Sequence, residues 1–100
     1  MELNTTPSPW EVRDGFIYGA DGDIVAEGYG YVADDNLIAA APELLEALRE
    51  LIQTHEYSLR IGYERIIELG GDCDSPEIMI NKDSSLKKAK VAIAKALGQQ

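Results

Sequence analysis

The chain has 100 residues, of which 45% are hydrophobic and 27% are charged, and its formal net charge is −9. This composition is typical of a folded protein, and the length suits a single domain with a modest core. No run approaches the roughly 20 apolar residues that a membrane span needs. Cys73 is the single cysteine, which excludes an internal disulfide and a cysteine-based zinc site.

The charge is distributed unevenly along the chain. Residues 1–48 contain ten carboxylates and one base, Arg13, whereas residues 49–81 contain seven acids and three arginines. Residues 82–100 reverse the sign, with five lysines and one acid, Asp83. An acidic front portion repels nucleic acid and is attracted to basic protein surfaces, so the charge favours a protein partner. Plain solubility is the alternative explanation for the acidic charge.

Short alternating segments in the first third predict a three-stranded antiparallel meander. Residues 1–9 form a polar, extended lead-in, because Pro7 and Pro9 oppose helix. Each strand then alternates apolar and polar residues, and each pair of strands is joined by an Asp-Gly turn. The expected strands are Trp10–Arg13, Phe16–Tyr18 and Ile24–Glu27, with turns at Asp14-Gly15 and Asp21-Gly22. Residues 28–31 extend the third strand with a bend or a bulge.

Two acidic residues mark the start of the helical part of the chain. Asp34, with Asp35 behind it, is a candidate N-cap, and both charges favour a helix N-terminus. We expect a short helix over Asn36–Ala41. Pro42 then suits the first turn of a second helix, because its missing N–H costs nothing there.

The second helix is expected to extend from about residue 42 to about residue 69. One continuous helix of that length would span about 40 Å at 1.5 Å per residue. A break near Ser58 or Gly62 is the alternative, because glycine costs about 1 kcal/mol inside a helix. The pair Gly70-Gly71 is expected to end the helix.

The last third is predicted to be a loop followed by an amphipathic helix. Residues 71–82 form the loop, in which Ile78–Ile80 is a strand or a packed turn. Ser84 or Ser85 caps the last helix, which Gly98 closes. Its buried apolar stripe is expected to be Leu86, Ala89, Ile93 and Leu97. Its solvent-exposed face is expected to be Lys87, Lys88, Lys90 and Lys95. The predicted fold class is therefore α+β, a three-stranded N-terminal meander packed on two or three helices in a single domain, 1–100.

The sequence contains no signature of a catalytic residue, a cofactor site or a metal site. His55 has no second histidine at i+4, so a structural or surface role is expected. Gly28-Tyr29-Gly30 lacks the third glycine of a phosphate loop, and Asp21-Gly22-Asp23 lacks the spacing of a calcium loop. We therefore expect a protein that is not an enzyme and that needs no cofactor.

The sequence does predict a surface for binding another protein. Aromatic side chains beside charged ones are typical interface anchors. The candidate protein-binding residues are Glu11, Asp14, Asp21, Asp23, Glu27, Tyr29, Tyr31, Asp34 and Asp35. The alternative interpretation assigns the aromatic residues, Trp10 and Phe16 above all, to the core face of the sheet.

Four segments resemble a family of small phage and prophage proteins. The most specific is Asn36–Leu48, which is similar to the family signature Leu-Ile-Ala-Ala-Ala-Pro-Glu-Leu-Leu-Glu-Ala-Leu, although the Ala-Arg pair that precedes it in the family is absent. The other segments are Thr6–Trp10, the hairpin at Asp21–Ala26, and Ala92–Gly98. The four segments follow in matching order through about two thirds of the chain, which is what remains outside residues 53–85, and residues 53–85 do not match.

The resemblance implies a phage origin and no catalytic residues, and some small acidic phage proteins are anti-CRISPR inhibitors. Our first hypothesis is an inhibitor that binds the host CRISPR surveillance complex and blocks DNA recognition by occupying a basic DNA-binding surface. It would act in the bacterial cytoplasm, since Met1-Glu2-Leu3-Asn4 lacks the features of a signal peptide. The alternative is a phage accessory or structural interaction protein, which is either a monomer or a dimer formed through the long helix. In neither case do we expect direct binding to nucleic acid or to a membrane.

Overall fold

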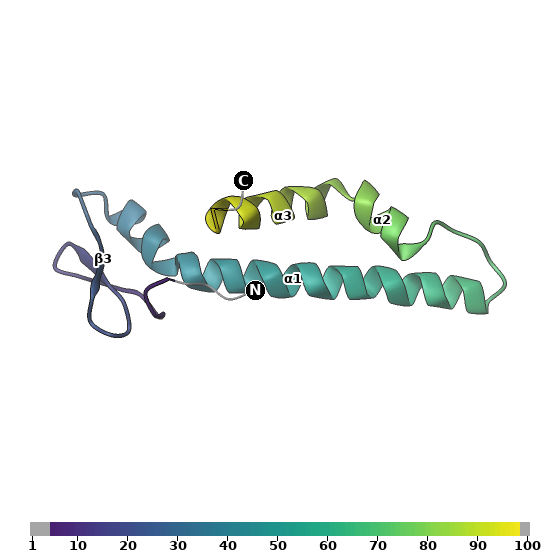
Figure 1. The fold of residues 1–100 in the computed structure, drawn as a ribbon, viewed down its shortest axis with the longest axis horizontal. Coiled ribbons are helices and arrows are strands. Elements are labelled where there is room, and N and C mark those ends of the chain that lie inside the picture. The colour runs from purple at the N-terminus through teal and green to yellow at the C-terminus, as the bar shows by residue number, and fades with distance from the viewer. Residues whose placement is uncertain (1–4, 99–100) are drawn as a thin grey trace. The chain divides into compact units, whose positions relative to one another are not determined.

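The computed structural model describes residues 5–98, so the first four residues of the expected lead-in lie outside the described part. Its elements follow in the order β1 (Glu11–Arg13), β2 (Phe16–Tyr18), β3 (Ile24–Glu27), α1 (Val32–Glu68), α2 (Pro76–Lys82) and α3 (Ser84–Ala96) (Figure 1). The three strands form one antiparallel sheet in the order β1-β2-β3. A sheet of this kind followed by three helices confirms the expected α+β class.

The chain divides into two compact units, Met1–Glu46 and Ala47–Gln100. The first contains the sheet and the beginning of α1, and the second contains the rest of α1 together with α2 and α3. The expectation of one domain over the whole chain stays a prediction. Among residues 5–98, no helix combines the length and the apolar character that crossing a membrane requires.

The sheet depends on a tight turn between β1 and β2. Asp14 and Gly15 have φ values of 51° and 80°, and this left-handed pair is what a two-residue hairpin turn requires. In the resulting register Val12 pairs with Ile17, and Ile17 pairs with Ala26. Directly paired residues point to the same face, so these three form the inward face, on which Ile17 is fully buried.

Phe16 and Tyr18 lie on the opposite face of the sheet from Ile17, because successive side chains in a strand alternate. Their ring centroids are 6.3 Å apart, and the Arg13 guanidinium lies 4.4 Å from the centre of the Tyr18 ring. The interpretation of Phe16 as part of the core face is therefore wrong. The cation over the ring stabilises the outward face by about 0.5–1 kcal/mol.

The described part of the lead-in folds back on the loop between β2 and β3. The indole Nε1 of Trp10 donates to the Thr6 carbonyl at 2.9 Å, and the Ala20 N–H donates to the Pro7 carbonyl at 2.8 Å. Gly19 is buried at this contact, and a Cβ there would lie 3.1 Å from the Pro7 oxygen and collide with the Thr6 methyl. Glycine therefore lets the two segments approach each other.

The start of α1 differs from the expected N-cap. The helix begins at Val32, so Asp34 and Asp35 lie in its first turn rather than before it. The Asp35 N–H donates to the Tyr31 carbonyl at 3.1 Å, which extends the hydrogen bonding ahead of the helix. Both carboxylates still lie where the helix dipole favours negative charge.

α1 is one continuous helix, which corrects the expectation of a separate helix over Asn36–Ala41. Pro42 lies inside it and leaves the Ile38 carbonyl without its usual i+4 partner. The flanking alanine, leucine and glutamate residues are strong helix formers, and they outweigh the loss of one hydrogen bond. The alternative of a break at Ser58 or Gly62 is also wrong, since the helix includes both positions.

The expected end of α1 at the glycine pair is confirmed. The Gly71 N–H donates to the Ile66 carbonyl at 2.9 Å, and the Gly70 N–H donates to the Ile67 carbonyl at 3.0 Å. These two bonds define a Schellman motif, in which the residue after the cap adopts a left-handed conformation. Gly70 does so, with a φ of 80°.

α2 takes the place of part of the loop expected over residues 71–82. The Ser75 side chain accepts from the Ile78 N–H at 3.4 Å, and Pro76 occupies the start of the helix. A serine cap followed by proline is a recognised helix start, so this signal was present in the sequence. The expectation of a strand or packed turn at Ile78–Ile80 is wrong.

Replacement of glycine by alanine should have opposite effects on stability at Gly62, inside α1, and at Gly70, in the C-terminal cap of α1. Gly70→Ala should lower the free energy of unfolding by about 1 kcal/mol, because alanine is strained in a left-handed conformation. Gly62→Ala should raise it by about 0.5–1 kcal/mol, since Gly62 lies inside α1 with open space around it. Urea titrations followed by circular dichroism measure both, and equal effects of the two variants would contradict the assigned cap.

Candidate protein-binding surface

The first unit exposes nearly all of the side chains predicted to bind a partner. Tyr29 and Tyr31 are 83% and 70% exposed, in the segment that joins β3 to α1. Six of the carboxylates that we expect to bind a partner are also exposed, and they are Glu11, Asp14, Asp21, Asp23, Glu27 and Asp34. We call these eight residues the acidic surface.

The register of the sheet places two of these acids at the end of the sheet nearest the β1–β2 turn. Asp14 is part of that turn. Glu27 pairs with Phe16, the first residue of β2, and the neighbouring Gly28 N–H donates to the Gly15 carbonyl at 2.8 Å. Asp14 and Glu27 therefore belong to the same end of the sheet, and we call them the turn group.

Three acids belong to the opposite end of the sheet. Glu11 pairs with Tyr18, the last residue of β2, from which the loop to β3 leaves. Asp21 and Asp23 lie in that loop, and the Asp23 N–H donates to Asp21 Oδ1 at 3.0 Å, which fixes the loop locally. We call these three residues the loop group. A strand of three residues is about 10 Å long, so about 10 Å separates the two groups.

Asp35 differs from the other predicted binding residues because it is buried. It is 7% exposed, and its carboxylate lies against Gly28, where a Cβ would come within 2.5 Å of Oδ2 and 2.6 Å of Oδ1. A side chain packed in this way is not available to a partner. The structure therefore removes Asp35 from the predicted binding residues and assigns it to the packing of the first unit.

Two lysines of the second unit, Lys82 and Lys90, form ion pairs with acids of the same unit. Lys82 Nζ lies 2.9 Å from Asp74, and Lys90 Nζ lies 2.6 Å from Glu56. Within the acidic surface, Glu11 approaches the Arg13 guanidinium at 4.0 Å, and both side chains are exposed, so this pair contributes little. The described ion pairs therefore leave the acidic surface strongly negative.

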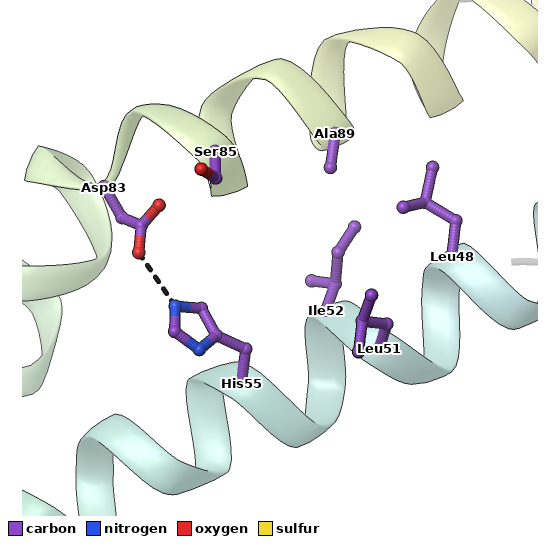
Figure 2. A pocket seen from close by; sticks show the side chains of 7 residues that line it. All are labelled: Leu48, Leu51, Ile52, His55, Asp83, Ser85 and Ala89. Atoms are coloured by element: carbon purple, nitrogen blue, oxygen red, sulfur yellow. Dashed lines mark hydrogen bonds and ion pairs between the residues drawn. The ribbon is translucent and has the colours of Figure 1, made fainter.

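The main polar junction of the second unit is Asp83, which no pattern in the sequence had singled out. Its N–H donates to the Ile80 carbonyl at 3.2 Å and ends α2, and its Oδ1 accepts from the Leu86 N–H at 3.0 Å and starts α3. Its Oδ2 accepts from Nε2 of His55 on α1 at 2.8 Å (Figure 2). The hydrogen bond from His55, with a smaller contribution from the Leu86 N–H, lowers the pKa of Asp83 below its ordinary value.

An open groove of about 540 Å³ lies beside this junction, within the second unit. Figure 2 shows Leu48 and Ile52 of α1 on one side of it and Ser85 and Ala89 of α3 on the other. The small side chains of α3 leave this space open. The groove is therefore mainly apolar, with Asp83 and His55 at one end.

His55, Asp83 and Ser85 are the residue types of a hydrolase triad, but their arrangement is different. A triad joins the serine to one imidazole nitrogen and the carboxylate to the other. Here Nε2 bonds to Asp83, and no hydrogen bond joins Ser85 Oγ to the imidazole in residues 5–98. The Ser85 N–H instead stabilises the Asp83 carboxylate. The described residues also contain no group of three or more histidine, cysteine or acidic side chains that could hold a metal ion.

The comparison with protein families identifies one that matches residues 1–100, the family of Salmonella phage P22 protein Y8K6. The chain belongs to this family. The expected membership of a small phage protein family is thereby confirmed. Comparisons with curated proteins and with solved structures give no match.

For this member of the Salmonella phage P22 protein Y8K6 family, the Asp83 junction predicts a pH dependence of stability. A carboxylate whose pKa is lowered by folding stabilises the protein above its ordinary pKa of 3.8, and that stabilisation is lost as the pH falls through the lower folded value. Asp83→Asn keeps an N-cap side chain but removes the charge. Wild type should therefore melt at a higher temperature than Asp83→Asn at pH 6, and the difference should close as the pH falls below the ordinary pKa of 3.8, because the folded pKa of Asp83 is lower still.

Calorimetry over that pH range measures this difference. Asp83→Ala is the matched control, since it removes the cap as well as the charge and should melt below Asp83→Asn at every pH. A difference between wild type and Asp83→Asn that does not change with pH would contradict the assigned role of the charge.

Proposed function

We propose that this phage-family protein is an inhibitory binding protein that occupies a basic, DNA-binding surface of the host CRISPR surveillance complex. It acts in the host cytoplasm by contact alone, without catalysis or a cofactor. The observation that carries the proposal is the acidic surface, in which six carboxylates and two tyrosines of the first unit are exposed.

The spacing of the acids supports competition with DNA. The turn group and the loop group lie about 10 Å apart, while duplex DNA presents one charge per about 1.7 Å of helix axis. The two groups therefore span the length over which a basic channel contacts several phosphates. A channel lined by lysine and arginine to bind DNA attracts such an acidic surface by the same electrostatic interaction.

The tyrosines supply what the carboxylates lack, which is contact area that stabilises the complex after encounter. Tyr29 and Tyr31 flank Gly30, whose φ of 94° turns the chain between them. Large aromatic side chains are common among the residues that carry most of the binding energy at interfaces. We therefore assign the carboxylates to steering and register, and the two tyrosines to anchoring.

Charge reversal in the loop group tests the proposal. The double variant Asp21→Lys and Asp23→Lys should slow association with the assembled complex at low salt by at least about tenfold, because charge steering raises association rates. The matched control is Lys87→Glu with Lys88→Glu, which also changes two exposed charges but in the second unit, and it should leave binding unchanged. Surface plasmon resonance at several salt concentrations measures both, and a gel shift measures whether target DNA still loads.

Two results would overturn the proposal. One is normal DNA loading on the complex in the presence of saturating protein. The other is loss of binding in the lysine variant with full binding in the aspartate variant. Either result would favour the alternative, a phage accessory interaction protein that acts through its helices.

A further inference from the structure

The second unit buries little of its apolar surface. In described residues 47–98, Leu86 is the one large apolar side chain that is buried, at 4% exposure. The exposed large apolar side chains are Leu51, Tyr57, Ile61, Ile66, Ile67, Leu69, Ile78 and Val91. Helices in proteins depend on packing of an apolar face more than on helix propensity. Exposed apolar surface on this scale indicates an interaction surface.

One face of the second unit carries a protruding side chain next to the groove. Leu51 borders the groove and is 65% exposed. Opposite it, Ser85 and Ala89 line the groove, and Ala92 and Ala96 continue the row of small residues along α3 at spacings of three and four. The same face thus contains a large exposed apolar side chain, Leu51, and a mainly apolar groove that could accept such a side chain.

We propose that a second copy of this chain docks on this face. A twofold axis places Leu51 of each copy in the groove of the other, because a twofold interface uses the same patch on both subunits. The two helix pairs, each formed by α1 from residue 47 and α3, then make a four-helix bundle. The apolar side chains beside the groove become its core.

Charge complementarity selects the arrangement of the two copies. α3 carries four lysines and no acid, and Lys88 is exposed one residue before Ala89 of the groove. On α1, Glu50 is exposed one residue before Leu51. If the twofold axis is parallel to the helices, α1 of one copy lies on α3 of the other, and Glu50 meets Lys88. If the axis crosses the helices, α1 meets α1, and Glu50 meets Glu50, which is unfavourable.

The proposal does not rest on the proposed function, because its surface lies wholly in the second unit. Sedimentation equilibrium of the full chain over a concentration series should give twice the chain mass of 11.0 kDa. Leu51→Glu should shift the mass to that of one chain. Tyr57→Glu is the matched control, since Tyr57 is 62% exposed and lies about 120° around the helix from Leu51, and it should remain a dimer.

A charge exchange tests the arrangement of the two copies. Glu50→Lys and Lys88→Glu should each weaken dimerisation by about tenfold, and the double variant should restore it, because the opposite charges meet again. Glu50→Lys combined with Lys87→Glu should not restore it, since Lys87 follows Leu86 of the buried stripe on the other flank of α3. Circular dichroism checks that each variant keeps its helix content.

A wild-type chain that stays monomeric at every concentration would overturn the proposal, as would a dimer that survives Leu51→Glu. A dimer lost in Tyr57→Glu but kept in Leu51→Glu would place the contact on a different face of α1. Failure of the double variant to restore dimerisation would refute the parallel arrangement.

Discussion

The helices of the second unit meet at one acidic residue, Asp83. The backbone N–H of Asp83 ends α2, and its carboxylate starts α3 and bonds to His55 of α1, so three helices meet at a single residue. α2 has seven residues and α3 has thirteen, and helices of these lengths are marginal alone in water. Leu86 is the one buried apolar residue in described residues 47–98. The contacts of Asp83 therefore help to position the helices, a role that a larger apolar core has in other proteins. Polar contacts therefore orient the helices, and apolar side chains remain exposed.

In the first unit, backbone pairing and a buried apolar residue hold the fold, and most of the charged side chains remain exposed. Its sheet is held by backbone pairing around Ile17 and by turns that suit Asp14 and Gly15, so most of its carboxylates take no part in packing. Asp35 is the exception, and it is buried against Gly28. Acids that the fold does not need are free to contact a partner. The two units thus offer different surfaces, one charged and one apolar, and we assign a heterologous partner to the first and a second copy to the second.

The sequence predicted those features that local rules determine. Alternation and Asp-Gly pairs predicted the three strands, and the glycine pair predicted the end of α1. The expectation that a new helix starts at Pro42 was wrong. The loss of one backbone hydrogen bond costs less free energy than the helix propensity of the surrounding residues contributes. Asp83 was missed because its partner His55 lies 28 residues away, and two serines after it were equally good caps. The burial of Asp35 was not predictable either, since it depends on the space that Gly28 leaves in the folded unit.

The shared cap also restricts how the family can vary in length. Because Asp83 alone separates α2 from α3, the rotation of α3 about its axis is tied to that of α2. A single residue inserted there would turn α3 by about 100°. That rotation would carry the row of small residues away from the groove and bring lysines in its place. Insertions and deletions among relatives should therefore gather in the segment between α1 and α2, where a change of length leaves the facing sides of the helices intact.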